Sequence, residues 1–459
     1  MGRVGRRSSN SRIHHLLNYS DKKLFIVFFI LAAALVVDNS FSQVADLVRD
    51  QIVSFWGWVL FVAIAATYAT CQFLIMEMIR TKIKERGSGA NRISMVITIV
   101  QYVLISIIVF LIVQMVVSSQ YYKDLLTATT TISWISALFL TTLLTVRLLS
   151  WYKTHKQPIV LLYGLAAACM VLTGIATIVF FDAVLLTKDP LIFPESEVLF
   201  NPGYEEGAPI FYALDLIYYS QTVYILLLWG GTVLLLYHNY KRVGQAKFWT
   251  LVSLPVIAFM SIFLSFYQDI APTSPVTEAI SSNFFIPILL LLYSGYGVSV
   301  IWGLSFIFVG RILKHGINAR AYMIIAGFGF ILFGITSVAS VSFPAYPPYG
   351  ISTMAALPLS MFMVLIGLSY SAISVAQDQT LRTSIRKSVK DMKFLESIGT
   401  AQIEQDLQKR VLTIAKKNSD VMTEQTGVQP SLTEDEMKEY LVMVVNEIKR
   451  TEHDATQKK

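Results

Sequence analysis

The sequence contains little cysteine and little charge for its length. Cys71 and Cys169 are the only cysteines among 459 residues, and both lie inside apolar runs, so a disulfide framework is excluded. Charged residues make up 15% of the chain, whereas soluble domains carry about a quarter. This shortage of charge excludes an ordinary soluble protein and indicates that much of the surface faces lipid.

The sequence also lacks the motifs of common catalytic and cofactor sites. It contains no Gly-rich phosphate loop, no nucleophile elbow and no zinc-binding spacing of Cys and His. We therefore predict that the protein is not an enzyme, has no catalytic residue and no metal site, and needs no cofactor. No nucleic-acid partner is expected either.

Long apolar runs dominate what is present, and 54% of the residues are hydrophobic. A helix needs about 20 apolar residues to cross the hydrocarbon core, and lipid offers no partner to a free backbone N–H or C=O. We predict an all-α fold, a polytopic transmembrane helix bundle of about ten helices with a short cytosolic helical tail. The expected segments are 23–41, 52–78, 93–118, 125–149, 158–182, 209–237, 248–267, 285–309, 321–341 and 355–376.

The charges of the connecting segments support this count and set the orientation. With an intracellular N-terminus, only Arg49, Lys123 and Lys188 of the 37 Lys and Arg residues fall on the outer side. Cytoplasmic loops of membrane proteins carry such an excess of basic residues, and an odd number of helices would move a basic loop outside. We expect a multi-pass protein of the cell membrane, embedded in the lipid bilayer, with both termini in the cytosol.

Composition divides the chain into five parts. The central outer loop is acidic, which favours solubility and orientation or, alternatively, steering of a cationic ligand. Five helices on each side of this loop would make the two halves inverted, as in several transporter folds, although no residue-level repeat relates them. The parts are a basic N-terminus at 1–22, helices at 23–187, the extracellular loop at 188–208, helices at 209–376 and the cytosolic tail at 377–459.

The tail contains two expected helices. The first is basic and amphipathic, and anionic head groups attract each basic side chain near the surface by about 1 kcal/mol. Its expected lipid contacts are Arg382, Arg386, Lys387, Lys390 and Lys393. The second begins at the capping box Ser431-Leu432-Thr433-Glu434 and carries an a/d seam that can pack on the preceding helix or on a cytosolic protein. The seam consists of Met437, Leu441, Val444 and Ile448.

Two polar helix faces are the candidate ligand site. On the sixth expected helix the spacing i, i+3, i+4, i+7 places four polar residues on one face, and tyrosines follow on the eighth. An acidic, tyrosine-lined cleft of this kind can hold a small extracellular cation or amine through charge and cation–π contacts. Interhelical hydrogen bonds and interfacial tyrosines are the alternative reading. The residues are Asp215, Tyr218, Tyr219, Thr222, Tyr293 and Tyr296.

Small residues and prolines mark further points of the helices. Gly295, Ser299 and Gly303 form a small-xxx-small series, which lets helices approach closely. Pro358 can kink or start a helix. Packing and ordinary helix starts explain both features, and a discontinuity at a binding site is the alternative for the proline.

The second half of the chain resembles an uncharacterised multi-pass membrane family of ammonia-oxidising archaea. The similarity rests on YPPYG at 346–350, SAISVAQD at 371–378 and LRTSIRK at 381–387. It implies an archaeal cell membrane and carries no activity, because the family has no assigned function.

Three classes of function remain open. A sensor would pass a membrane or extracellular signal to the tail through the last transmembrane helix, because a basic helix follows it directly. A transporter of a small solute would fit ten helices with Pro and Gly interruptions, although helix centres lack evident coupling charges. A scaffold or complex subunit is the third class.

Overall fold

A computed structural model describes most of the helical part of the chain. The described residues are 5–43, 55–84, 88–118, 121–186, 191–192, 209–238, 240, 244–253, 255–256, 298–312, 317–342, 349–377, 397–407 and 413. Within them, eight helices are long and apolar enough to cross a membrane. The predicted fold class, an all-α polytopic bundle, is confirmed.

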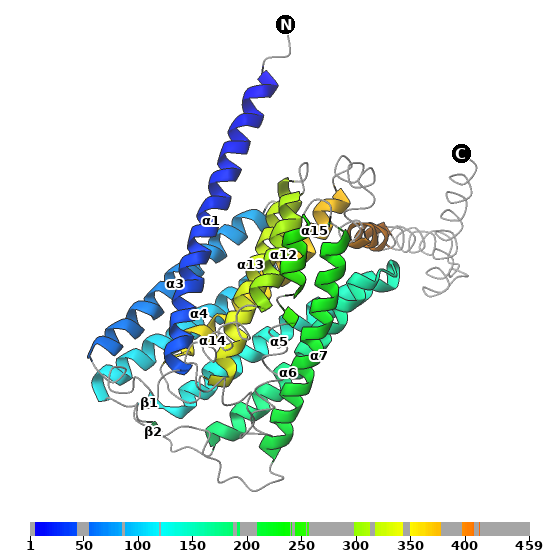
Figure 1. The fold of residues 1–459 in the computed structure, drawn as a ribbon. Coiled ribbons are helices and arrows are strands. Elements are labelled where there is room, and N and C mark those ends of the chain that lie inside the picture. The colour runs from blue at the N-terminus through cyan, green and yellow to red at the C-terminus, as the bar shows by residue number, and fades with distance from the viewer. Residues whose placement is uncertain are drawn as a thin grey trace, which may run out of the picture.

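Figure 1 shows the long helices α1 to α7 running up and down the bundle in turn. Their bounds are α1 Gly5–Gln43, α3 Phe55–Lys84, α4 Ser88–Ser118, α5 Lys123–Thr154, α6 Pro158–Leu186, α7 Pro209–His238, α12 Val298–Ile312, α13 Ile317–Ser342, α14 Ile351–Ala355 and α15 Leu357–Gln377. A two-residue antiparallel ribbon pairs β1 (Tyr121–Tyr122) with β2 (Leu191–Ile192). The ribbon joins the connection between α4 and α5 to the connection between α6 and α7.

Helix α15 is the centre of the bundle. In the span Ile351–Val375, which α14 and α15 form together, every residue except the partly buried Ile373 is buried, whereas only 33% of the most apolar stretch of the α4 span, Arg92–Ser118, is buried. The α4 span is nevertheless the more hydrophobic, with a mean hydropathy of 2.9 against 2.0. The lipid-facing α4 span is the more hydrophobic of the two because apolar side chains are favourable in contact with lipid, while close helix packing favours small residues such as Ser360, Gly367 and Ser371 in α15.

Glycines bring α12, α13 and α15 into close contact. A Cβ atom on Gly327 of α13 would lie 2.6 Å from the backbone oxygen of Gly303 on α12, and one on Gly334 would overlap Ser299. A Cβ on Gly367 of α15 would lie 2.5 Å from the backbone nitrogen of Ala326. The small residues Ser299 and Gly303 therefore pack helices together, as expected from their spacing.

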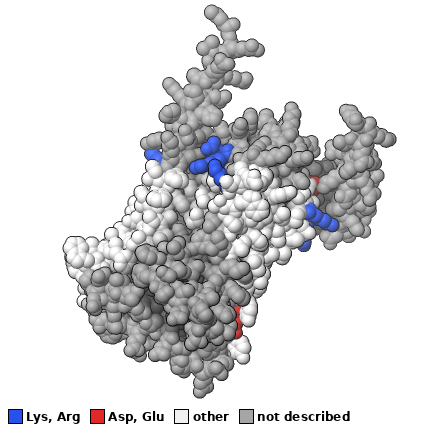
Figure 2. All heavy atoms as spheres, viewed as in Figure 1, with Lys and Arg blue, Asp and Glu red and all other residues white. Residues whose placement is uncertain are grey.

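Most of the described basic residues lie at one end of the bundle. Basic side chains lie at the helix ends nearest the start of α1, and Figure 2 shows them toward the upper part of the visible face. They include Lys23, Arg80, Lys82, Arg92, Lys153, Lys156, Arg311 and Arg320. The acidic residues Asp38, Asp124, Asp182 and Asp215 lie near the opposite helix ends.

Eight of the ten expected segments coincide closely with the long apolar helices. The segment expected at 285–309 is described only from Val298, as the shorter apolar helix α12. The segment expected at 248–267 lies largely outside the described residues, and so does the acidic loop apart from β2.

Candidate functional site

The last membrane span is interrupted near its N-terminal end. The short helix α14 ends at Ala355, a turn at Ala356 follows, and α15 begins at Leu357. Pro358 has no N–H to donate to the carbonyl four residues earlier, so a regular helix cannot run through this point. At the other end of α14, Gly350 has φ of 90°, a left-handed conformation that favours glycine.

A carboxylate from another helix caps the start of α14. Asp38 of α1 is completely buried, and its Oδ2 accepts hydrogen bonds from the Thr353 backbone N–H at 2.9 Å and from the Thr353 hydroxyl at 2.7 Å. Thr353 is the third residue of α14, where an N-cap acceptor is expected to bind. Because Gly350 has no side chain, Asp38 supplies this acceptor, and its charge suits the positive end of a helix.

The far end of α14 is held by two neighbouring helices. The carbonyl oxygen of Ala355 accepts hydrogen bonds from the Tyr68 hydroxyl of α3 at 2.9 Å and from the Gln101 amide of α4 at 3.3 Å. The same Tyr68 hydroxyl lies 2.8 Å from Gln101 Oε1. These bonds satisfy a carbonyl that the break leaves without its helical partner, which matters because an unpaired backbone group within lipid costs several kcal/mol.

Tyr349 fastens the residue before the glycine turn. Its hydroxyl donates to the carbonyl oxygen of Gly57 at 2.6 Å, and its ring stacks on Phe41 at 5.3 Å between centroids. Burial, together with the nearby Asp38 carboxylate, raises the pKa of Tyr349 to about 12. The phenol therefore stays protonated, and the bond to α3 is maintained at physiological pH.

A second polar feature is a pocket beside α15. It lies between α5, α6, α7, α13 and α15 and has a volume of about 30 Å³. Its lining includes the hydroxyl residues Thr141, Thr173 and Thr177 together with Trp134 and Gln221. The pocket thus places hydrogen-bonding groups deep between membrane spans.

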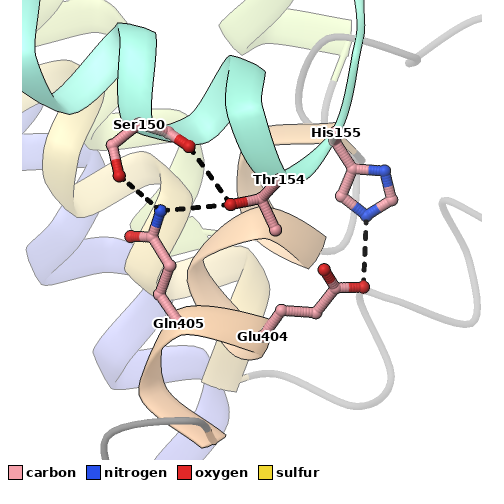
Figure 3. Close-up of polar contacts among 5 residues, drawn as sticks. All are labelled: Ser150, Thr154, His155, Glu404 and Gln405. Atoms are coloured by element: carbon pink, nitrogen blue, oxygen red, sulfur yellow. Dashed lines mark hydrogen bonds and ion pairs between the residues drawn. The ribbon is translucent and has the colours of Figure 1, made fainter. Parts of the chain in front are cut away.

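At the basic end of the bundle, a short helix of the tail docks on α5. This tail helix comprises residues 397–407. Figure 3 shows Gln405 pointing toward the end of α5, where its Nε2 donates to the Ser150 hydroxyl at 2.8 Å and to the Thr154 hydroxyl at 3.3 Å. His155, which directly follows the last residue of α5, has its Nε2 atom 3.7 Å from Glu404 Oε1.

A second glutamine joins the tail helix to α5. The Oε1 atom of Gln402 accepts from Arg147 at 3.3 Å and from the Trp151 indole N–H at 3.2 Å. Its Nε2 donates to Asp406 at 2.9 Å, which fixes the orientation of the amide. Arg147 also lies over the ring of Trp151, 5.3 Å from its centroid, in a cation–π contact.

The tail helix also touches the end of α15. Gly399 lies so close that a Cβ atom there would be 2.4 Å from Cγ1 of Val375 and 3.8 Å from the carbonyl oxygen of Ala372. Ile398 and Ala401 are completely buried beside it. Thus α15 contacts the tail helix at its last turns and continues from the capped helix α14 at its start.

The expected ligand residues on α7 lie on a face of the helix that is largely exposed. Asp215 is exposed, and Tyr218 and Tyr219 expose 42% and 73% of their surface. Thr222 is half-buried. The opposite face of α7, with Ile217, Gln221 and Tyr224, lines the pocket. The role of the exposed face in binding stays a prediction.

Several other expected residues lie outside the described part of the chain. They are Tyr293 and Tyr296, the lipid contacts Arg382, Arg386, Lys387, Lys390 and Lys393, and the seam residues Met437, Leu441, Val444 and Ile448. Conversely, sequence reasoning missed the capping role of Asp38 and the docking role of Gln402 and Gln405. The glutamines are three residues apart and follow Gly399 and Ala401, which is the one pattern that pointed to a packed helix face.

Comparisons of the chain with protein-family models, with curated proteins and with solved structures gave no match. The functional argument therefore starts from the residues themselves, and the resemblance to an archaeal family stays a prediction.

Proposed function

We propose that this protein is a membrane-embedded sensor in which α15 relays a change inside the bundle to a cytosolic tail. One observation carries the proposal: α15, which is buried along almost all of its described length, continues from α14, which Asp38 caps, and packs on Gly399 of the tail helix at its other end. A change at the start of the span thus has a direct physical route to the tail.

The packing of α15 favours rigid motion over local adjustment. Close-packed interiors have low compressibility and transmit strain, and small shifts of a packed helix are a common means of switching. Gly367 and Gly399 leave no room for α15 to move without displacing its neighbours. A shift that changes the cap at Asp38 would therefore change the surface on which the tail helix rests.

The orientation follows the positive-inside rule. The tail helix lies at the end of the bundle where the described Lys and Arg residues gather (Figure 2), and membrane proteins retain such residues in the cytoplasm. We place the tail and the N-terminus in the cytosol and the Asp38 end of the bundle toward the outside.

The relay is tested by measuring the position of the tail helix after a change at α14. Cys71 and Cys169 would be replaced by serine, and spin labels attached at Leu407 of the tail helix and at Lys247, both exposed. We expect Asp38→Asn, which weakens the cap, to shift or broaden the distance distribution between these labels. Asp182→Asn is the matched control, because Asp182 is an exposed acid near the same end of the bundle.

A second label pair separates tail movement from loss of the fold. Labels at Lys156 and Lys247 lie on the bundle and should keep their distance in both variants, since neither residue belongs to the tail. If Asp38→Asn leaves the Leu407 distribution identical to that of Asp182→Asn while the bundle remains folded, the relay is wrong.

Transport of a small solute is the second candidate function. The observation that favours it is a carboxylate buried within a membrane span beside an interrupted helix, since ionisable residues in such positions mark substrate or ion pathways. Flux of sodium or methylammonium into vesicles containing the purified protein, present in the wild type and abolished by Asp38→Asn, would establish transport. Unchanged tail distances in the same variant would then assign Asp38 to transport alone.

A further inference from the structure

The pocket between α5, α6, α7, α13 and α15 is lined by uncharged side chains within the membrane spans. Its volume of about 30 Å³ is enough for about two water molecules. Trp134 and Thr141 lie on α5, Thr173 and Thr177 on α6, and all four belong to the membrane spans of these helices. The pocket therefore lies between helices at membrane depth, and hydroxyl groups form part of its lining.

One residue of the lining, Trp134, carries a strong donor without an acceptor. Trp134 is 5% exposed, and its indole N–H finds no hydrogen-bond partner within the part of the chain that the structure describes. A buried donor left unsatisfied destabilises the protein. A ligand with an acceptor atom would recover this loss.

The threonines of the pocket offer acceptors. The hydroxyls of Thr141 and Thr177 donate to the carbonyl oxygens four residues earlier, at 2.7 Å in each case. Thr173 donates to Cys169 in the same way and also lies 2.8 Å from the Ser220 hydroxyl. Because the hydroxyl hydrogens are used within the helices, the free lone pairs of the oxygens remain to accept hydrogen bonds.

The absence of charge in the lining selects against ions. No Asp, Glu, Lys, Arg or His is among the pocket residues that the structure describes. An ion taken from water into such a site would lose most of its solvation energy, which only paired or multiply coordinated charges recover. A neutral molecule loses only the solvation of its polar groups, and hydrogen bonds to the indole N–H and the hydroxyl oxygens can replace it.

We propose that this pocket binds a small uncharged solute that both donates and accepts hydrogen bonds, such as a short alcohol or amide. Its volume limits the solute to about two to four non-hydrogen atoms. Met361 of α15 belongs to the lining, so a solute bound in the pocket would contact the helix of the proposed relay. Any effect of this binding on the tail rests on the proposed relay. Binding itself is independent of the relay and is measured separately.

The test uses the full chain labelled with 5-fluorotryptophan, which gives one fluorine resonance for each of the seven tryptophans. Trp134→Phe and Trp302→Phe assign two of them. Trp302 is the internal reference, because its indole N–H is also buried and without a partner in the described residues, yet it does not line the pocket. Ethanol and acetamide are titrated as neutral probes, and methylammonium chloride as a charged one.

We expect ethanol or acetamide to shift the Trp134 resonance saturably and to leave Trp302 unchanged. Thr177→Val, which keeps the shape and removes the acceptor, should weaken the binding about 3- to 10-fold. Thr141→Val serves the same purpose if Thr177→Val does not fold. Ser106→Ala, on the exposed side of α4, is the control and should leave the binding constant unchanged.

Three results would each overturn the assignment: no saturable shift at Trp134, equal shifts at Trp134 and Trp302, or stronger binding of methylammonium than of the neutral probes. Saturable binding without any change in the Leu407 label distances would instead preserve the pocket and refute the relay.

Discussion

Replacing Thr353 with valine tests whether the carboxylate cap of α14 stabilises the bundle. The Thr353 side chain is completely buried, and its hydroxyl lies 2.7 Å from Asp38 Oδ2 and 3.1 Å from the carbonyl oxygen of Leu35. Valine has nearly the same shape, so the change removes the hydroxyl without opening a large cavity. Asp38 would lose this hydroxyl donor and keep the bond from the Thr353 backbone N–H.

The expected loss of stability follows from the kind of bond removed. A hydrogen bond to a charged group contributes about 1.5–3 kcal/mol in soluble proteins, whereas polar contacts between membrane helices average about 0.6 kcal/mol and reach about 1.7. The acceptor here is a buried carboxylate, so we expect the upper part of the membrane range. Thr353→Val should therefore lower the free energy of unfolding by about 1–2 kcal/mol.

Unfolding in mixed micelles with increasing dodecyl sulfate, followed by circular dichroism, measures this difference. Thr67→Val is the matched control, because the Thr67 hydroxyl is exposed and bonds only to Ala63 of its own helix at 2.7 Å, and its effect should stay within about 0.5 kcal/mol. A double-mutant cycle with Asp38→Asn should show coupling between positions 38 and 353. Equal effects of Thr353→Val and Thr67→Val, or additive effects in the cycle, would refute the capping argument.

Three further changes probe other parts of the structure. Gly327→Ala places a Cβ 2.6 Å from the backbone of α12 and should destabilise the bundle by about 1–3 kcal/mol. Gly230→Ala, whose Cβ would meet nothing closer than 3.7 Å, should not destabilise it. Both variants are measured in the same unfolding assay. Gly399→Leu should displace the tail helix from α15 and broaden the Leu407 label distances while the bundle remains folded. The pKa of Tyr349 is raised to about 12, from about 10 in the unfolded chain. Its contribution to stability is therefore present below pH 10 and decreases between pH 10 and 12. The stability advantage of the wild type over Tyr349→Phe should accordingly be smaller at pH 11 than at pH 9.

The membrane fold was accessible from the sequence because the hydrocarbon core imposes length and composition on every span. Eight expected segments matched long helices for this reason. The inward faces were not accessible, because lipid is as apolar as a helix interface and apolar periodicity disappears. Asp38 and Asp215 illustrate the difference: both are acids near helix ends on the same side of the bundle, yet Asp38 is completely buried and Asp215 is exposed.

The break between α14 and α15 shows a second limit of sequence reasoning. Pro358 indicates a helix start, and both an ordinary start and a discontinuity agree with it. What distinguishes them is the set of partners for Ala355, and those partners, Tyr68 and Gln101, are more than 250 residues earlier in the chain. Contacts over such separations leave no local pattern in a single sequence.

The chemistry of the docked tail suits a reversible contact. Two glutamines make four side-chain hydrogen bonds between the tail helix and α5. The net contribution of each such bond is modest, because the free side chains bond to water instead. A ligand that binds the docked and released states with different affinities can therefore shift the balance between them. A tail fixed by buried ion pairs would not respond to a shift of α15, whereas one held by Gln402 and Gln405 can.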